Sequence, residues 1–283
     1  MHQLVSLERS WVEAELGYLS EDAVDPEVYL CEPPAGVSPE SGGVDLRRVR
    51  IHGARSAGAS LTLEREGFTF VRDSLPGIDY EDADQVQSVY YPRLVDMALS
   101  ATGGREAYVF DHLVRQRDPD VEMHLFGRRG AGERVGALGR VHTDYTEKSG
   151  QLRRDYIVET FGLNSLPHLY CIVNLWRSIG GVIEDSPLAF CSANSVSTHD
   201  LIPSSLHYRH RVGEIYQVKH NASHRWWHLE NMSNEDVAIF KQFDSRVSGV
   251  ARMVPHSAFS LPTAMCSSTR RRSIEARVFV VLQ

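Results

Sequence analysis

The sequence predicts a mainly β protein with flanking helices, arranged as a double-sheet jelly roll. After residue 160 the chain consists of short strand-like segments with turn signals between them and few helical patterns. The clearest helical pattern, over residues 83–100, precedes these strands. No internal repeat or low-complexity segment divides the chain, and 283 residues suit one large β domain. We therefore expect a single domain over residues 1–283.

Composition and charge exclude several classes of protein. Hydrophobic residues make up 42% of the chain and charged residues 24%, which is ordinary for a soluble globular protein. The formal net charge of −7 disfavours nucleic acid and anionic membrane surfaces as partners, because both attract basic patches. We find no apolar run of membrane-spanning length and no signal peptide, so we expect a cytoplasmic protein. Cys31, Cys171, Cys191 and Cys266 are too scattered to predict a disulfide framework or a zinc site.

The first 65 residues are expected to form an N-terminal arm and an irregular extension, ahead of a jelly-roll core that begins at residue 66. A short helix is expected from Leu7 to Tyr18. The Pro- and Gly-rich stretch over residues 32–43 breaks regular structure and is typical of a surface loop. Residues 45–52 alternate in the manner of a strand.

The next part of the chain is expected to carry a strand, a helix and a second strand. Residues 67–72 have the aromatic and β-branched content of a short strand. In residues 83–100 apolar side chains recur near a 3.6-residue period, and Gly103 follows as a C-cap glycine would. Residues 107–115 form the second strand. The glycine-rich residues 127–132 lack the spacing and the ending of a phosphate-binding loop, so we expect a flexible connection there.

Strands become dense after a second helix, which is expected over residues 152–161. Residues 168–177 are predicted as a central strand, with Asn174 as a polar residue among apolar neighbours on one face. A buried amide needs a partner, and the candidates are an oxygen of a bound cosubstrate and a neighbouring backbone group. The other elements predicted in this half are strands over residues 186–191 and 212–220 and a short capped helix over residues 237–243.

The stretch Val141–Thr146 contains two potential metal ligands. His142 and Asp144 are two residues apart on an extended segment, so alternation points both side chains to the same side. His256, far downstream in a strand-like run, would complete a face of two histidines and one carboxylate, which suits non-haem Fe(II) and its oxygen chemistry. His-x-Asp also occurs by chance, because the chain has 13 histidines. The His142–Asp144 segment lies where a short strand enters a loop, and this position favours a catalytic site.

An arginine-rich strand at the end of the chain supports this interpretation. Residues 271–281 carry arginines ahead of an apolar end. A guanidinium is the expected partner of a carboxylate, and a 2-oxo acid cosubstrate needs its distal carboxylate held while its other end chelates the metal. Alternation places Arg271, Ser273 and Arg277 on one face of the strand. From the residues alone, these features predict an iron oxygenase.

Several segments, taken in order, resemble one known family. They are residues 139–146, 174–177, 185–189, 213–216, 224–227, 243–245, 255–259 and 271–277. The sequence resembles the fungal and bacterial hydroxylase/desaturase family, which includes a gibberellin desaturase and a cephamycin methoxylation protein. Residues 68–115 are similar to the N-terminal half of that family, so the likeness covers nearly all of the chain after about residue 65.

The resemblance implies a double-stranded β-helix, or cupin-like jelly roll, that uses Fe(II), 2-oxoglutarate and O2. By position, it implies that His142, Asp144 and His256 are the catalytic residues and the metal ligands. Arg271 and Ser273 match the Arg-x-Ser pattern by which related oxygenases hold a cosubstrate carboxylate.

A departure from the family leaves the cosubstrate contact open. Where the family has a proline-rich approach to the last strand, this chain has residues 263–269, which contain no proline. The arginine that contacts the 2-oxoglutarate carboxylate is therefore one of four, namely Arg270, Arg271, Arg272 and Arg277. Asn174 is a further candidate for cosubstrate binding, and Tyr145 and Trp176 are candidates for the substrate pocket or for contacts to the metal ligands.

The implied activity is oxidation of a small molecule of secondary metabolism by abstraction of a hydrogen atom from a C–H bond. Hydroxylation, desaturation and ring closure are all compatible with the sequence. Two alternatives use the same residues: a divalent-metal hydrolase, for which no extra general base is evident, and a non-catalytic small-molecule-binding jelly roll, against which the complete triad argues. We expect a monomer or homodimer with a small-molecule substrate and with neither nucleic acid nor membrane as a partner.

Overall fold

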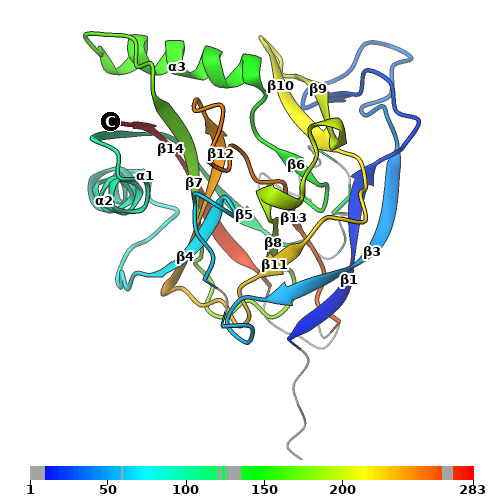
Figure 1. Cartoon of the computed structure of the whole chain (residues 1–283), viewed down its shortest axis with the longest axis horizontal. Helices are drawn as coiled ribbons and strands as arrows, with labels where there is room; N and C mark the ends of the chain where they lie inside the picture. The colour runs from blue at the N-terminus through cyan, green and yellow to red at the C-terminus, as the bar shows by residue number, and fades with distance from the viewer. Residues whose placement is uncertain are drawn as a thin grey trace, which may run out of the picture.

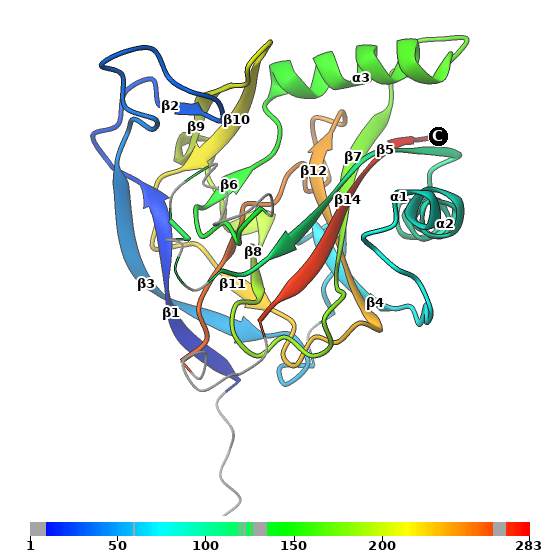
Figure 2. The same cartoon turned by 180° about the vertical axis from the view of Figure 1, so that it is seen from behind.

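The computed structural model describes residues 10–58, 60–118, 120, 123–124, 126, 135–262 and 270–283. Within these residues two β-sheets stand against each other, with helices on the outside (Figures 1 and 2). The larger sheet contains, in spatial order, β1 (Trp11–Leu19), β3 (Val44–Gly53), β11 (Trp226–His228), β8 (Leu188–Cys191), β13 (His256–Ala258), β6 (His142–Thr143), β10 (Val212–Val218), β9 (Leu201–His207) and β2 (Glu27–Tyr29). The smaller sheet contains β4 (Phe68–Arg72), β12 (Asp236–Asp244), β7 (Tyr170–Ser178), β14 (Arg272–Val281) and β5 (Glu106–Gln116).

Most of the predicted strands are confirmed. The strands expected over residues 45–52, 67–72, 107–115, 168–177, 186–191 and 212–220 correspond to β3, β4, β5, β7, β8 and β10. Neighbouring strands are antiparallel except for two pairs, β11 with β3 and β2 with β9. In the larger sheet β6 lies between β13 and β10, so three segments that are far apart in the sequence become neighbours.

The helix predicted over residues 83–100 is confirmed and consists of α1 (Ala83–Gln85), the π-helical turn η1 (Val86–Tyr90) and α2 (Tyr91–Thr102). The Asp82 carboxylate caps its start by accepting hydrogen bonds from the first free backbone N–H groups. Gly103 ends it with a φ of 67°, a left-handed conformation that glycine adopts without strain. Leu94 and Ala98 are buried in one cluster with residues of β7 and β14. The helix α2 lies on the outside of the smaller sheet (Figure 1).

The second predicted helix is α3 (Glu147–Phe161), which starts earlier than expected because Thr146 and Ser149 cap it. The Ser149 N–H donates to Thr146 Oγ1 at 3.1 Å, and the Thr146 N–H donates to Ser149 Oγ at 2.9 Å. This cap fixes the direction of the chain immediately after the predicted metal-binding segment. The helix lies across one end of the two sheets (Figure 2). Two 3-10 turns, η2 (Ala193–Ser195) and η3 (Thr198–Asp200), precede β9.

The helix expected from Leu7 to Tyr18 is wrong over its described part, because β1 begins at Trp11; residues 7–9 lie outside the described part of the chain. Every residue of β1 pairs with β3. Ala14, Leu16 and Tyr18 are buried while Glu13 and Glu15 are exposed, which is the two-residue alternation of a strand with one buried face. This part of the predicted irregular extension therefore belongs to the larger sheet.

The short helix expected over residues 237–243 is also wrong, because β12 lies there between β4 and β7 in the middle of the smaller sheet. All residues of β12 are buried. A strand that is covered on both faces carries apolar residues at successive positions, so it lacks the two-residue alternation and can be mistaken for a helix.

The space between the sheets holds one of the hydrophobic clusters. Trp176 and Phe240 of the smaller sheet pack there with Leu188 and Phe190 of the larger sheet. The ring of Phe240 also contacts His256, with centroids 4.9 Å apart. The cluster therefore supports the wall on which the predicted metal-binding residues lie.

The glycine-rich residues 127–132 and residues 263–269, including Cys266, lie outside the described part of the chain. Within the described ranges, none of the helices has the length and apolar character that a membrane crossing requires.

Candidate active site

Sheet pairing brings the two predicted histidine ligands together. His142 of β6 and His256 of β13 are register partners, and their ring centroids are 4.4 Å apart. Asp144 follows β6, and its Oδ1 atom lies 3.6 Å from His142 Nε2. The potential ligand atoms of the three residues all lie within 4.8 Å of one another. The three side chains predicted as a triad therefore converge on one point.

Backbone carbonyl groups orient both imidazoles. His142 Nδ1 lies 2.8 Å from the Arg140 carbonyl oxygen, and His256 Nδ1 lies 3.2 Å from the Val254 carbonyl oxygen. A ring nitrogen that donates to a carbonyl carries the proton, which leaves the lone pair on Nε2. Each carbonyl belongs to the residue two positions before its histidine, so the local backbone itself selects the form that can bind a metal through Nε2.

Two nitrogen donors hold one oxygen of the Asp144 carboxylate. Asn174 Nδ2 donates to Asp144 Oδ2 at 2.8 Å, and Arg277 Nε donates to the same oxygen at 3.2 Å. Sheet register explains this convergence, because Asn174 of β7 and Arg277 of β14 are paired. The other oxygen, Oδ1, faces His142. The carboxylate is thus held so that a single oxygen is presented to the triad.

The charges of the triad suit a divalent cation. Burial acts to raise the pKa of Asp144, but the Arg277 guanidinium and then the hydrogen bond with His142 hold that pKa well below its usual range. Burial, reinforced by His142, lowers the pKa of His256 to about 3. Asp144 is therefore ionised and His256 is neutral at pH 7, which are the protonation states that bind metal.

Gln242 connects the triad to the smaller sheet. It lies at a β-bulge in β12, where the pairing with β7 shifts between Lys241 and Phe243. Its Oε1 accepts a hydrogen bond from the Asp144 N–H at 2.7 Å, and its Nε2 donates to the carbonyl oxygens of Lys241 and Val254 at 3.2 and 3.4 Å. Sequence analysis missed Gln242, although a polar residue inside an apolar run was an available signal.

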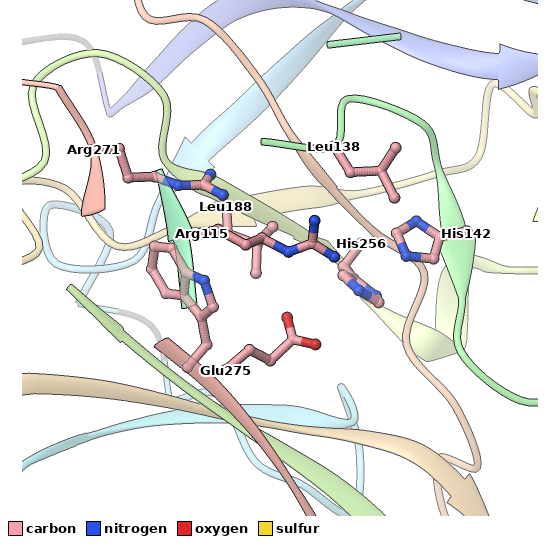
Figure 3. Close-up of a pocket in the computed structure, with 8 residues that line it drawn as sticks. Arg115, Leu138, His142, Leu188, His256, Arg271 and Glu275 are labelled. Carbon is pink, nitrogen blue, oxygen red and sulfur yellow. The ribbon is translucent and has the colours of Figure 1, made fainter. Parts of the chain in front are cut away.

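A small cavity lies beside the two histidines (Figure 3). It is lined by Arg115, Leu138, His142, Trp176, Leu188, His256, Arg271 and Glu275. The walls combine apolar side chains with two guanidinium groups. Such a lining suits a small anionic ligand whose charged ends are bound and whose middle is shielded from water.

Arg271 is the only one of the four candidate arginines that lines this cavity. It is 3% exposed, and its Nη1 donates to the Ser186 carbonyl oxygen at 2.8 Å. Burial and then the neighbouring charge of Arg115 lower the pKa of Arg271 to about 10. Arg271 Nε and Ser273 Oγ are both buried and have no hydrogen-bond partner among the described residues.

The other three arginines are placed differently. Arg277 bonds to carboxylates of the protein, namely Asp111, Asp144 and Glu275. Arg272 pairs with Glu81 at 2.8 Å near the surface, and Arg270 is exposed. Sequence analysis missed Arg115, which lines the cavity from the end of β5, because no motif marks an arginine that ends an apolar strand.

The three remaining predicted site residues have different surroundings. Trp176 lines the cavity, whereas Tyr145 is buried in a cluster with Ile157 of α3 and Phe243. Asn174 binds the carboxylates of Asp144 and Glu275, a type of partner that the sequence did not suggest.

Comparison with known sequences identifies related proteins. The sequence model of a family described as "Oxidoreductase/YMDC permease-like domain" matches residues 16–281. The chain is 28% identical to "Alpha-ketoglutarate-dependent dioxygenase phiK" from Fungal sp. (strain ATCC 74256), over 99% of this chain and 100% of that protein. It is 26% identical to "Hydroxylase/desaturase efuI" from Hormonema carpetanum, over 82% of each chain.

A solved structure shares the fold. The structure titled "iron and alpha-ketoglutarate-dependent endoperoxidase NvfI" matches with a TM-score of 0.81 and 22% identity, over 97% of this chain and 99% of that one. This likeness confirms the predicted jelly roll.

Proposed function

The chain belongs to the oxidoreductase family whose model covers residues 16–281, together with the hydroxylase/desaturases, and we propose that it is an Fe(II)/2-oxoglutarate-dependent oxygenase of small molecules. The observation that carries this proposal is the convergence of His142, Asp144 and His256 beside a cavity lined by Arg271. The relatives named as a dioxygenase and as a hydroxylase/desaturase support it. They favour an oxygenase over a hydrolase or a non-catalytic binding module.

The donor set fits iron. His142 and His256 each offer an imidazole Nε2, and Asp144 offers one ionised carboxylate oxygen. Two imidazoles and one carboxylate on one face are the ligands that non-haem Fe(II) oxygenases use, with the remaining positions left open. These three residues would hold the iron.

The polar groups that line the cavity suit the carboxylates of 2-oxoglutarate. Arg271 and Ser273 would hold the carboxylate remote from the metal, because each has a buried polar atom without a partner among the described residues. An unsatisfied buried donor costs about 1–3 kcal/mol, and a bound carboxylate would remove that cost. Arg272 lies on the opposite face of β14, where it pairs with Glu81. It is therefore not needed to bind the cosubstrate carboxylate.

When bound, Fe(II), 2-oxoglutarate and O2 together supply the oxidising power that removes a hydrogen atom from a substrate C–H bond. The chain supplies position and shielding. Asn174 and Arg277 orient the Asp144 carboxylate, while Leu138 and Leu188 exclude water from the cavity. The position of the substrate decides between hydroxylation, desaturation and ring closure.

The proposal is tested by cosubstrate turnover. The protein is purified without oxygen, supplied with Fe(II), 2-oxoglutarate and then O2, and assayed for succinate. We expect succinate from the wild type and its loss in His256→Ala and in Asp144→Ala. The control is His199→Ala, which removes an exposed histidine distant in the sequence from the triad and should keep turnover. Succinate formation that persists in both triad variants would contradict the assignment of the ligands.

A further inference from the structure

A second guanidinium, that of Arg115, enters the cavity that Arg271 lines. β5 and β14 are antiparallel neighbours, and Arg115 is the register partner of Ser273. Side chains directly opposite each other in an antiparallel pair lie on the same face of a sheet. Figure 3 shows the Arg115 guanidinium extending toward His256 and His142, with the Arg271 guanidinium on the other side of the cavity.

The two guanidiniums lie at different ends of the cavity. In Figure 3 the Arg115 guanidinium points toward the rings of His256 and His142. The Arg271 guanidinium lies farther from both rings, and its Nη1 donates to the Ser186 carbonyl oxygen at 2.8 Å. Arg115 therefore lies at the metal end of the cavity, and Arg271 lies at the remote end.

Arg115 has few partners in the described part of the protein. Its Nη1 donates to the Gly136 carbonyl oxygen at 3.0 Å, and no salt bridge joins it to a described carboxylate. Arg277, by contrast, bonds to three carboxylates. The other N–H donors of the Arg115 guanidinium are thus available to a ligand, since a guanidinium has five N–H donors.

The remaining carboxylate in the cavity does not neutralise both guanidiniums. Glu275 Oε1 already accepts hydrogen bonds from Asn174 Nδ2 and Arg277 Nη2, both at 3.2 Å. Arg115 and Arg271 therefore leave the cavity with an excess of positive charge. A dianion with one carboxylate at each end matches this arrangement better than a monoanion.

We propose that Arg115 binds the carboxylate next to the 2-oxo group of the cosubstrate, while Arg271 and Ser273 bind the carboxylate at its other end. This assignment deepens the proposed function and rests on it. The two arginines therefore differ in which ligands they bind. A 2-oxo acid with only one carboxylate, such as pyruvate, depends on Arg115 for binding and not on Arg271.

The test measures binding without turnover. Protein loaded with Mn(II) in place of iron is titrated with 2-oxoglutarate and with pyruvate in a calorimeter. Arg115→Gln should weaken both ligands by similar factors of about tenfold to a hundredfold, the range for a charge-assisted hydrogen bond. Arg271→Gln should weaken 2-oxoglutarate by a similar factor and leave pyruvate within about twofold. Arg272→Gln, on the opposite face of β14, is the control and should change neither.

Four results separate the possible outcomes. If the Mn(II)-loaded wild type binds neither ligand, the proposed function fails. If the wild type binds both and Arg115→Gln leaves pyruvate unchanged, the proposed function stands and the role of Arg115 is overturned. Mn(II) affinity should be unchanged in Arg115→Gln, because a loss there would mean that Arg115 acts through the metal ligands, which also overturns the assignment. If Arg115→Gln does not fold, Arg115→Lys is tested instead, because it keeps the positive charge but not the planar guanidinium. It should still weaken the binding of both ligands, and unchanged binding would overturn the proposal.

Discussion

Replacing Arg277 with glutamine tests the network that holds Asp144. Arg277 contacts Asp144 and Glu275 at 3.2 Å each, and the side chains of these carboxylates are only 14% and 6% exposed. Its third partner, Asp111, is 54% exposed, so that contact contributes little. Removing one partner of a buried ion pair leaves an uncompensated charge and costs about 3–5 kcal/mol. We therefore expect Arg277→Gln to lower the free energy of unfolding of the metal-free protein by about 3–5 kcal/mol.

The effect of Arg277→Gln should depend on pH in a defined direction. The pKa of Asp144 is lowered in the folded protein, so its contribution to stability is present above the pKa of the unfolded chain and is lost as the pH falls through the folded value. The difference between wild type and variant should therefore be full at pH 7 and shrink below about pH 4.

Urea unfolding in the presence of a chelator measures this difference. Arg272→Gln is a matched control on the same strand. It loses only the ion pair with Glu81, in which the side chains of Arg272 and Glu81 are 37% and 44% exposed. It should therefore change the free energy of unfolding by less than about 1 kcal/mol. Equal losses in the two variants, or a loss for Arg277→Gln that does not change between pH 7 and pH 3, would refute the reasoning.

Three other substitutions test the surroundings of the triad. Gln242→Leu removes the acceptor for the Asp144 N–H and should weaken Mn(II) binding about 10–100-fold in a competition titration, whereas unchanged affinity would show that the bulge does not position the ligands. Burial lowers the pKa of His256 to about 3, below the ordinary 6.5, so the metal-free protein should lose stability as the pH falls from 6.5 toward 3. His256→Gln should reduce this fall in the free energy of unfolding between pH 6.5 and pH 3, measured by urea unfolding at several pH values. A fall equal to that of the wild type would contradict the argument from burial. Gly150→Ala would place a Cβ atom 2.5 Å from Phe243 Cδ2 and should destabilise the protein by about 1–3 kcal/mol, seen as a lower melting temperature; no change in melting temperature would mean that α3 shifts freely.

The triad could be predicted from the sequence because its geometry is partly local. His142 and Asp144 share a side of one extended segment, and the chain keeps that arrangement into the α3 cap. The sequence does not specify the pairing of β6 with β13 that brings His256 beside His142. Arg271 was one of four candidates, and only burial and cavity lining distinguish it from its neighbours.

The parts that could not be predicted depend on tertiary contacts. Arg115 and Gln242 become site residues only when β5 meets β14 and when β12 bulges beside β7. The same cause explains the two wrong helices. β12 has no alternation because it is buried on both faces, and β1 is a strand because β3 pairs with it.

The most direct test of the central claim is to locate the metal. Crystals grown with Fe(II) in the absence of oxygen should give one strong anomalous peak within bonding distance of His142 Nε2, His256 Nε2 and a carboxylate oxygen of Asp144. A crystal that holds iron elsewhere, or that shows these three side chains without a shared peak at saturating iron, would contradict the account.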